Sequence, residues 1–384
     1  MAVSETAPER ALLVGIDARE LQGKTTGTGR YLRNLLRVWT RDTPDRFVAY
    51  FSGPDPVDPA LDPLRVRRRS LGPLTAGDLY WQERLLPRAV ESDGLDVFFS
   101  PAYTCPLRLR IPRVTAVHDL SYFSYPQDFS FLHAWKRRFL VARSLQASRR
   151  ILACSDFTRR EVASRFPALA DRVAHVPLGR DDDLQAPPSR EEARRRLDVT
   201  GPLVLTVGSL FNRRCLPELL RAVSLLRSHD HGRLKGVVLD VVGDNRTNPW
   251  LDVAGLVLRL GLGAHVRLSG FVDEAGLADR YAAADAAVFL SEYEGFGLPA
   301  LEAASRGVPL VVSNRPSLSE VFGAAALVVD PRNEREIAGA LGRVLGEPTL
   351  RKLLVHQGRA LASRHSWTRT AALTRDALVA AAWS

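Results

Sequence analysis

Hydrophobic residues along the chain fall in short runs that alternate with longer stretches of helical spacing. The run at residues 11–17 is bounded by turn residues, which is typical of a buried parallel strand. A glycine-rich stretch, Gly23–Gly29, follows and predicts a loop. Apolar residues over Arg30–Trp39 then recur every three or four positions and predict a helix. Strand, loop and helix together form one βα unit.

The same alternation continues in two series along the chain. The first series predicts strands at Val48–Phe51, Val97–Ser100, Arg113–Val117, Arg150–Ala153 and Ala174–Val176, and helices at 78–91, 129–148 and 156–165. The second series predicts strands at Leu203–Val207, Val237–Val242, Val266–Leu268, Ala287–Leu290, Leu310–Val312 and Ala326–Val329. We therefore expect the α/β class, with two Rossmann-like domains built on parallel sheets.

A polar, proline-rich stretch separates the two series and predicts a domain boundary. We expect an N-terminal domain at 1–178, a linker at 179–188, a C-terminal domain at 189–366 and an alanine-rich closing helix within 367–384. The closing helix fits either domain, and packing back on the N-terminal domain is one of the two solutions. A chain of 384 residues with 46% hydrophobic residues is long enough for two cores.

The composition indicates where the protein is found in the cell and whether its cysteines form disulfides or bind zinc. No run of 18 apolar residues occurs, and acidic residues stand near the N-terminus where a signal peptide would be basic and then apolar. We therefore expect a cytoplasmic protein. The three cysteines, Cys105, Cys154 and Cys215, are odd in number and far apart, which disfavours a disulfide framework and a structural zinc site.

The net charge of +10 is unevenly distributed, because residues 1–178 hold 27 Lys and Arg against 19 Asp and Glu. Nucleic acid, an anionic membrane and a merely solvated arginine-rich surface are the three interpretations. No recognition helix, zinc finger or aromatic RNA-binding motif occurs, so we expect no nucleic-acid partner.

Phe131, Trp135 and Phe139 recur at a spacing of four, with basic residues between them. A basic amphipathic helix of this kind suits the surface of an anionic membrane. The alternative is an ordinary helix whose aromatic side lies in the core. A lipid-linked acceptor on the inner face of the membrane would explain both the aromatic residues and the excess positive charge.

The most informative stretch runs from Ser291 to Ala303, after a predicted strand. Pro299 favours the start of a helix, and the preceding Gly295, Phe296, Gly297 and Leu298 can bring backbone amides to an anion. We expect a diphosphate at this place. Glu302, one turn into the helix, is suited to ribose hydroxyls, and Glu294 on the loop to the transferred group.

Glu294 and Glu302, which enclose Gly-Phe-Gly-Leu-Pro, resemble the paired-glutamate motif of glycosyltransferase family four, the group 1 glycosyltransferases. The resemblance implies the GT-B fold, two Rossmann-like domains whose parallel sheets face a central cleft. It also implies a retaining transferase that takes its sugar from a nucleoside diphosphate.

Further segments resemble the family in the same order along the chain, from about residue 17 to 330. They are Asp17-Ala18-Arg19, Gly27-Thr28-Gly29-Arg30-Tyr31, His118-Asp119-Leu120-Ser121, Val207 to Leu216, Val242-Gly243-Asp244-Asn245 and Val266 to Val272. The glycine stretch alone lacks a full dinucleotide fingerprint.

The resemblance also implies roles for single residues. His118 would contact the donor sugar near its reacting carbon, and Arg213 and Arg214 would hold the diphosphate where the family has an Arg-Lys pair. Cys215 stands where the family usually has Asn. The remaining donor-binding residues would be Gly27, Gly29, Gly208, Ser209, Gly243 and Phe271.

Breaking a sugar–phosphate bond builds negative charge on the departing diphosphate, so the site needs positive potential there. Arg213, Arg214 and the amides of the glycine loop are suited to this. The resemblance implies same-face attack, in which the leaving phosphate oxygen takes the acceptor's proton while Glu294 and His118 orient the sugar. Asp181-Asp182-Asp183 looks like an Asp-x-Asp metal motif, but it lies in the predicted linker, so we expect no metal and no other cofactor.

Two other enzyme classes remain as alternatives. A sugar-nucleotide epimerase with the GT-B fold shares the nucleotide site, and an NAD(P)-dependent oxidoreductase shares the Rossmann-like domains but is disfavoured by the incomplete glycine fingerprint. The expected hexose is mannose or rhamnose, and the expected acceptor is a glycan or lipid-linked sugar of the cell surface.

Overall fold

The structure is a computed structural model that describes residues 10–23, 26–54, 58, 61–72, 78–180, 188–229 and 233–383. It divides into two compact units. Unit 1 comprises Met1–His118, Arg137–Gly179 and Trp367–Ser384, and unit 2 comprises Asp119–Lys136 and Arg180–Ser366. The division differs from the predicted one at residues 119–136, which group with unit 2. Most of the predicted linker at 179–188, including Asp181, Asp182 and Asp183, lies outside the described residues.

Unit 1 is built on a seven-stranded parallel sheet with the order β3-β2-β1-β4-β5-β6-β7. Its strands are β1 (Leu13–Asp17), β2 (Arg46–Phe51), β3 (Val66–Ser70), β4 (Val97–Ser100), β5 (Arg113–Val117), β6 (Arg150–Ala153) and β7 (Val173–His175). Val14 and Ile16 of β1 are completely buried, as expected for a parallel strand covered on both faces.

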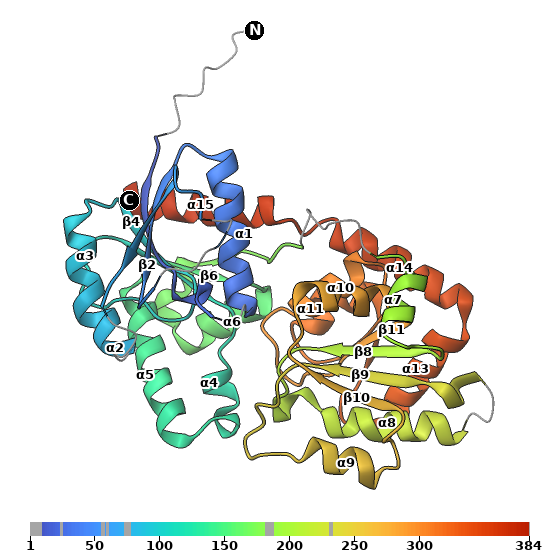
Figure 1. The fold of residues 1–384 in the computed structure, drawn as a ribbon. Coiled ribbons are helices and arrows are strands. Elements are labelled where there is room, and N and C mark those ends of the chain that lie inside the picture. Colours follow the sequence, from blue (N-terminus) through green and yellow to red (C-terminus); the bar gives the residue numbers. More distant parts are fainter. Residues whose placement is uncertain are drawn as a thin grey trace. The chain divides into compact units, whose positions relative to one another are not determined.

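The helices of unit 1 lie around this sheet (Figure 1). They are α1 (Gly27–Asp42), α2 (Asp78–Tyr80), α3 (Leu86–Ser92), α6 (Asp156–Arg165) and α15 (Trp367–Trp383), together with most of α5 (Phe131–Ala147), which begins in unit 2. The predicted single helix at 78–91 is instead divided, because a π-helical turn at Trp81–Leu85 separates α2 from α3.

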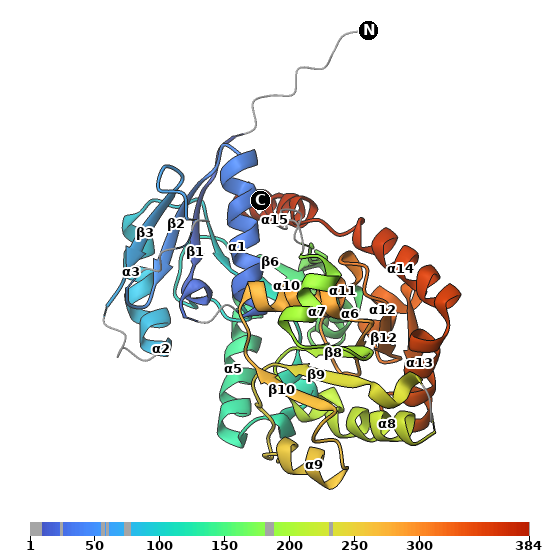
Figure 2. The same cartoon turned by 45° about the vertical axis from the view of Figure 1, so that its right-hand side comes forward.

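The closing helix α15 lies beside α1 in both ribbon views (Figures 1 and 2). The indole of Trp39 in α1 donates a hydrogen bond to the carbonyl of Ala371, at 3.0 Å. Arg375 forms an ion pair with Asp45 at 2.6 Å, and both side chains are buried. These contacts attach the C-terminal segment to unit 1.

Unit 2 contains a six-stranded parallel sheet with the order β10-β9-β8-β11-β12-β13. Its strands are β8 (Leu203–Val207), β9 (Val238–Val242), β10 (Val266–Gly270), β11 (Ala286–Phe289), β12 (Leu310–Ser313) and β13 (Ala326–Val329). A buried apolar cluster that includes Val204, Leu239 and Val288 forms its core.

Helices cover both faces of this sheet, with α8 on one face and α10 and α11 on the other (Figures 1 and 2). The helices of unit 2 are α4 (Ser121–Ser124), α7 (Arg190–Arg196), α8 (Leu216–His229), α9 (Val253–Arg259), α10 (Glu274–Ala283), α11 (Leu298–Ser305), α12 (Leu318–Phe322), α13 (Glu334–Gly346) and α14 (Pro348–Ala362).

Both sheets have a topological switch point, where the strand order reverses. It lies between β1 and β4 in unit 1 and between β8 and β11 in unit 2. Ligands of open parallel sheets bind outside the carboxyl ends of the strands at such points. A ligand-binding site of unit 2 is therefore expected at the loops that follow β8 and β11.

Candidate functional site

The loops that follow β8 and β11 meet at the switch point of unit 2. The loop after β8 contains a short 3-10 helix, Asn212–Arg214, and the loop after β11 runs from Leu290 to Gly297. The amide of Glu292 donates a hydrogen bond to the carbonyl of Arg213 at 2.8 Å, which joins the two loops directly. Residues about 80 positions apart in sequence thus form one surface.

Gly208 and Gly243 let the backbones that follow β8 and β9 approach each other closely beside this surface. Gly208 has a φ of 125°, and a Cβ placed on it would lie 2.3 Å from Nη1 of Arg214. Gly243 has a φ of 138°, and its Cβ would lie 2.2 Å from the carbonyl oxygen of Gly208. Only glycine fits at either position without a shift of its neighbours. Ser209, the next residue after Gly208, is partly exposed.

Arg214 and Glu294 form an ion pair across the two loops. Nη2 of Arg214 lies 3.1 Å from Oε1 of Glu294, and each side chain is 21% exposed. The second carboxylate oxygen of Glu294 accepts a hydrogen bond from the hydroxyl of Ser291 at 2.9 Å. Nη1 of Arg214 donates to the carbonyl of Val207, so both side chains are held in one orientation.

Arg213 is in a different environment from its neighbour. Its guanidinium is 9% exposed and forms an ion pair with Asp128, 2.8 Å from Nη1 to Oδ2. Burial lowers the pKa of Arg213, but the negative charges of Asp119, Asp128 and Glu294 more than offset this and raise it above its usual value. The buried side chain of Arg213 is therefore always positively charged.

The glycine loop leads into α11 as the sequence predicts. Gly297 is the N-cap residue with a φ of 94°, and a Cβ there would lie 2.6 Å from the side chain of Leu318. Gly295, in contrast, does not have a positive φ. Phe296 and Leu298 are buried and fix the loop against unit 2. Pro299 has no N–H and the amide of Ala300 donates to the carbonyl of Gly297 at 2.9 Å, so the amides that could face an anion are those that lead into α11, up to Leu298.

Glu302 lies one turn into α11 and is 3% exposed. Its Oε2 accepts a hydrogen bond from the hydroxyl of Tyr281 at 3.1 Å, which holds the carboxylate in place. Phe271 directly follows β10 and is 49% exposed. Since β10 is two strands away from β8 in the sheet, Phe271 lies farther from the switch point than the two arginines.

The other predicted site residues belong to unit 1. His118 directly follows β5, and its Nε2 lies 2.8 Å from the carbonyl oxygen of Pro101. The rings of Tyr31 and Tyr103 meet its imidazole edge-on, at 5.0 and 5.8 Å between centroids. The imidazole is thus held in one position. The backbone carbonyl of His118 also accepts a hydrogen bond from the thiol of Cys154.

Gly27 and Gly29 do not lie in a loop, and this part of the prediction is wrong. Helix α1 begins at Gly27, because the hydroxyl of Thr26 accepts a hydrogen bond from the amide of Gly29 and caps the helix. A Cβ on Gly29 would lie 2.4 Å from the carbonyl oxygen of Glu20. Gly29 therefore permits close packing of the chain rather than a turn.

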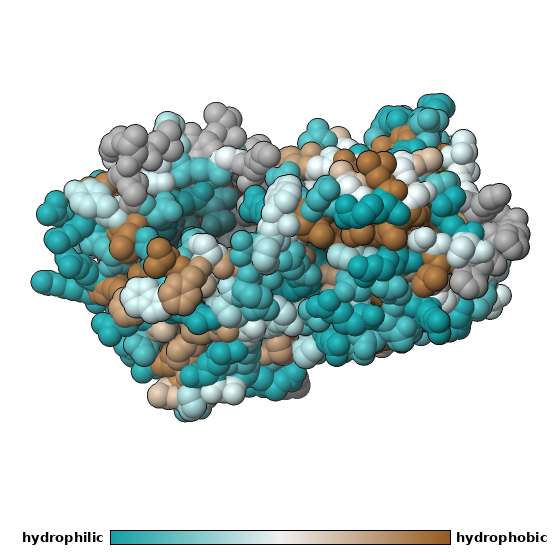
Figure 3. All heavy atoms as spheres, turned by 90° about the horizontal axis from the view of Figure 1, so that it is seen from below, coloured by the Kyte–Doolittle hydropathy of each residue, from teal (hydrophilic) through white to brown (hydrophobic). Residues whose placement is uncertain are grey.

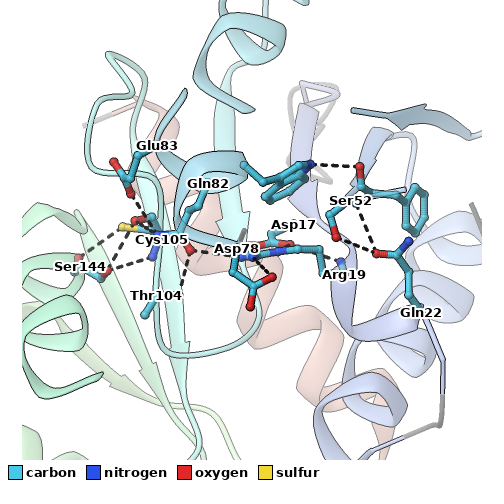
Figure 4. A network of polar contacts seen from close by, with 12 residues as sticks. Asp17, Arg19, Gln22, Ser52, Asp78, Gln82, Glu83, Thr104, Cys105 and Ser144 are labelled. Carbon is cyan, nitrogen blue, oxygen red and sulfur yellow. Dashed lines mark hydrogen bonds and ion pairs between the residues drawn. The ribbon is translucent and has the colours of Figure 1, made fainter. Parts of the chain in front are cut away.

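A polar network surrounds the carboxyl end of β1 in unit 1 (Figure 4). Arg19 donates two hydrogen bonds to the carboxylate of Asp17, at 3.0 and 2.7 Å, and a third to Gln82. Gln82 also accepts from Thr104 and donates to the carbonyl of Cys105. Asp78 is 82% exposed and lies 3.7 Å from Arg19. The network fixes the loops at the switch point of unit 1.

Two successive parts of the chain match known protein families. Residues 25–184 match Glycosyltransferase Family 4, and residues 189–361 match Glycosyl transferases group 1. The O-antigen chain mannosyltransferase B of Escherichia coli is 33% identical over 276 residues, which cover 71% of each chain. The chain belongs to the group 1 glycosyltransferases of family 4. It is therefore a glycosyltransferase, as its motifs implied.

A further relative and a solved structure are also similar to this glycosyltransferase. The MMP alpha-(1->4)-mannosyltransferase of Mycolicibacterium hassiacum is 30% identical over 250 residues, which cover 64% of this chain but only 56% of that relative. The sucrose-phosphate synthase of Thermosynechococcus elongatus has a TM-score of 0.77 at 22% identity, over 97% of this chain and 100% of the other. The predicted GT-B fold, with two Rossmann-like domains, is confirmed.

Several residues of the candidate site were not predicted from the sequence. Asp128 pairs with Arg213, and Ser291 holds Glu294. The hydroxyl of Ser317 donates to the carbonyl of Glu294 at 2.6 Å, and Tyr293 accepts a hydrogen bond from the amide of Leu120 at 2.7 Å. Only Ser291 and Tyr293 carried a signal, since they flank the glutamate motif.

The described residues of this glycosyltransferase contain no group of three or more His, Cys, Asp or Glu side chains placed to hold a metal ion. In the same part of the chain, the three cysteines are free and buried. None of the described helices is both long enough and apolar enough to span a bilayer.

Proposed function

We propose that this glycosyltransferase moves a hexose from a nucleoside-diphosphate sugar to a glycan or lipid-linked acceptor, with retention of the anomeric configuration. The observation that carries the proposal is the Arg214–Glu294 pair at the switch point, next to the N-terminus of α11. A cation, the backbone amides that lead into α11 and a neighbouring carboxylate support a diphosphate site here.

The chain's own groups would stabilise the departing diphosphate. As the bond between the sugar carbon and the phosphate oxygen breaks, its electron pair stays on that oxygen and the diphosphate gains charge. Arg214 and the backbone amides of the loop that leads into α11 would neutralise this charge, while Arg213 adds positive potential from its buried position. The acceptor hydroxyl would attack from the same face and give its proton to the leaving phosphate oxygen.

Carboxylates and a histidine would orient the donor. Glu294, fixed by Ser291 and Arg214, would bind hydroxyls of the transferred sugar. Glu302 would bind the ribose from its place in α11. His118, held at Pro101, would support the sugar near its reacting carbon. Gly208, Ser209, Gly243 and Phe271 would line the nucleotide, and Gly27 and Gly29 would lie at the phosphate side of unit 1.

The relatives suggest the sugar and the setting. The two curated relatives described above are both named as mannosyltransferases, and one is named for the O-antigen chain. We therefore favour mannose over rhamnose, and an acceptor in cell-surface polysaccharide synthesis. The reaction we propose needs no metal, because Arg213, Arg214 and the amides of the glycine loop supply the positive potential.

Ligand-induced thermal stabilisation would test the donor site. GDP, UDP, dTDP, ADP, NAD and NADP are compared with and without magnesium, since a ligand that binds only the folded state raises the unfolding temperature. Selective stabilisation by one nucleoside diphosphate, equal with chelator and with magnesium, is expected. Product analysis with the matching nucleotide sugar should then show transferred sugar. A freely isomerised sugar nucleotide would instead indicate an epimerase.

We further propose that α5 contacts an anionic membrane, where a lipid-linked acceptor would be found. Phe131, Leu132, Trp135 and Phe139 are 81, 77, 63 and 54% exposed, so the alternative of an aromatic side buried in the core is wrong. Lys136, Arg137 and Arg138 interleave with them. Figure 3 shows the molecule from below, and hydrophobic residues gather on the left of that view, over α5. Such a helix binds the headgroup region by apolar burial and charge.

Vesicle flotation would test this contact. The wild type should float with vesicles of anionic phosphatidylglycerol and less with neutral phosphatidylcholine. Phe131→Ser with Trp135→Ser should abolish flotation, and Trp250→Ser should not, because Trp250 is 71% exposed but lies outside α5. Equal flotation of all variants would contradict the proposal.

A further inference from the structure

The amino ends of three neighbouring strands in unit 1 carry arginines. Arg113 is the first residue of β5, Arg149 directly precedes β6, and Arg172 directly precedes β7. The three strands are adjacent and parallel, so their amino ends lie along one edge of the sheet, about 5 Å apart from strand to strand. The amide of Arg149 donates to the carbonyl of Arg113 at 2.8 Å, which fixes this register.

These arginines line one cavity of about 460 Å³, together with Arg110. The other lining residues are apolar or neutral, and no Asp or Glu is among those that line it in the described part of the chain. Four arginine side chains thus line one concave space. A volume of this size accommodates a small ligand.

Two of the four side chains are oriented by backbone carbonyls. Nη1 of Arg113 donates to the carbonyls of Pro106 and Leu107, at 3.1 and 3.0 Å. Its Nε is buried and has no hydrogen-bond partner among the described residues, although buried donors are normally satisfied. Nη1 of Arg172 donates to the carbonyl of Ser148 at 3.3 Å. The guanidinium groups of Arg113 and Arg172 are therefore held partly in place before any ligand binds.

The cavity is distinct from the donor site. His118 follows the carboxyl end of β5, whereas Arg113 stands at its amino end. A strand of five residues separates the two ends by roughly 13–16 Å. The cavity therefore lies at the opposite edge of the sheet of unit 1 from its switch point.

We propose that this cavity, lined by Arg110, Arg113, Arg149 and Arg172, binds a phosphate-bearing anion. Guanidinium groups match phosphate oxygens with paired, charge-assisted hydrogen bonds, and several around one cavity select a dianion or diphosphate over chloride. The anion is either a free phosphate compound or the headgroup of an anionic lipid. The site goes beyond the proposed transfer reaction and does not depend on it.

Calorimetric titration with inorganic pyrophosphate at fixed ionic strength tests the proposal. The wild type should show two classes of site, because the proposed donor site is also expected to bind diphosphate. Arg149→Gln with Arg172→Gln should weaken one class at least about tenfold, as expected when charged hydrogen bonds to an anion are lost. Arg214→Ala should weaken the other class. Sulfate at equal ionic strength serves as the control ligand.

The matched control is Arg84→Gln with Arg88→Gln, which removes two charges from other parts of unit 1. If this control weakens binding as much as the cavity variant does, or if Arg214→Ala removes all binding, the proposal is overturned. Flotation with phosphatidylglycerol vesicles then assigns the source. Loss of flotation in the cavity variant identifies a lipid headgroup, and retention identifies a soluble phosphate compound.

Discussion

Nη2 of Arg214 lies 3.1 Å from Oε1 of Glu294, although the two residues are 80 positions apart in the sequence. The pair joins the loop after β8 to the loop after β11, at the point where the strand order of unit 2 reverses. Because Val207 and Ser291 hold the outer atoms of the two side chains, the guanidinium is oriented before a ligand binds. Such preorganisation matters most where charge develops during a reaction.

Arg214→Ala should lower kcat for sugar transfer about 100- to 1000-fold, the usual effect of removing one group that stabilises developing charge. Arg214→Lys should recover part of the loss, since lysine keeps the charge but not the paired hydrogen bonds. Initial rates at saturating donor would measure both. An unchanged kcat with a raised KM in Arg214→Ala would indicate a role in ground-state binding only.

Gly208→Ala should reduce activity and stability together. The new Cβ would lie 2.3 Å from Nη1 of Arg214, on a backbone with a φ of 125°, so the guanidinium must move. Gly261→Ala is the matched control, since Gly261 also has a positive φ but nothing lies within 4 Å of its Cβ. The control should cost about 1–2 kcal/mol in the free energy of unfolding and leave activity unchanged. Equal activity in the two variants would contradict the steric argument.

The strands and the order of the two domains could be predicted from the sequence because buried parallel strands form short, continuous apolar runs. β4, β5 and β6 have the predicted bounds. β3 was missed, since Arg67, Arg68 and Arg69 occupy its centre and it lies at the edge of the sheet, where charged residues are tolerated. Local composition does not report on position within a sheet.

The candidate site could be predicted only where its residues follow one another in a motif. The glutamate motif located the loop after β11, and Gly208 and Gly243 followed from the resemblance. The Asp128–Arg213 pair joins segments 85 positions apart, and no local pattern reports such a contact. The exposed side of α5 was equally hidden, because helical spacing shows that a face is apolar but not what covers it.

Asp128→Asn should destabilise unit 2 by about 3–5 kcal/mol, because the buried Arg213 would lose the carboxylate that pairs with it directly. Chemical denaturation monitored by tryptophan fluorescence would measure the loss. Arg343→Gln is the control, since it breaks an ion pair with Glu347 in which both side chains are more than half exposed. That change should cost less than about 1 kcal/mol. A similar cost for both variants would show that burial does not govern the pair.

Glu20→Gln should stabilise the protein at neutral pH. Burial and the nearby Asp17 raise the pKa of Glu20 above its usual value, and the hydrogen bond from Thr26 and the charges of Arg19 and Arg137 offset only part of this. A carboxyl group whose pKa is raised on folding favours the folded state below its unfolded pKa, and this advantage is lost as pH rises through the folded pKa. At pH 7.5, a pH chosen well above about 4.3, the usual pKa of glutamate, the charged side chain therefore costs stability.

Thermal unfolding of wild type and Glu20→Gln from about pH 4 to 8 would measure this effect. The amide keeps an acceptor for the hydroxyl of Thr26, so the hydrogen bond that closes the start of α1 should survive. The variant should unfold at a higher temperature than the wild type at pH 7.5, and the difference should shrink as the pH falls. Glu91→Gln, an exposed change in the same unit, controls for the loss of one negative charge. A difference that grows toward acidic pH would reverse the sign and show that the carboxylate of Glu20 stabilises the fold.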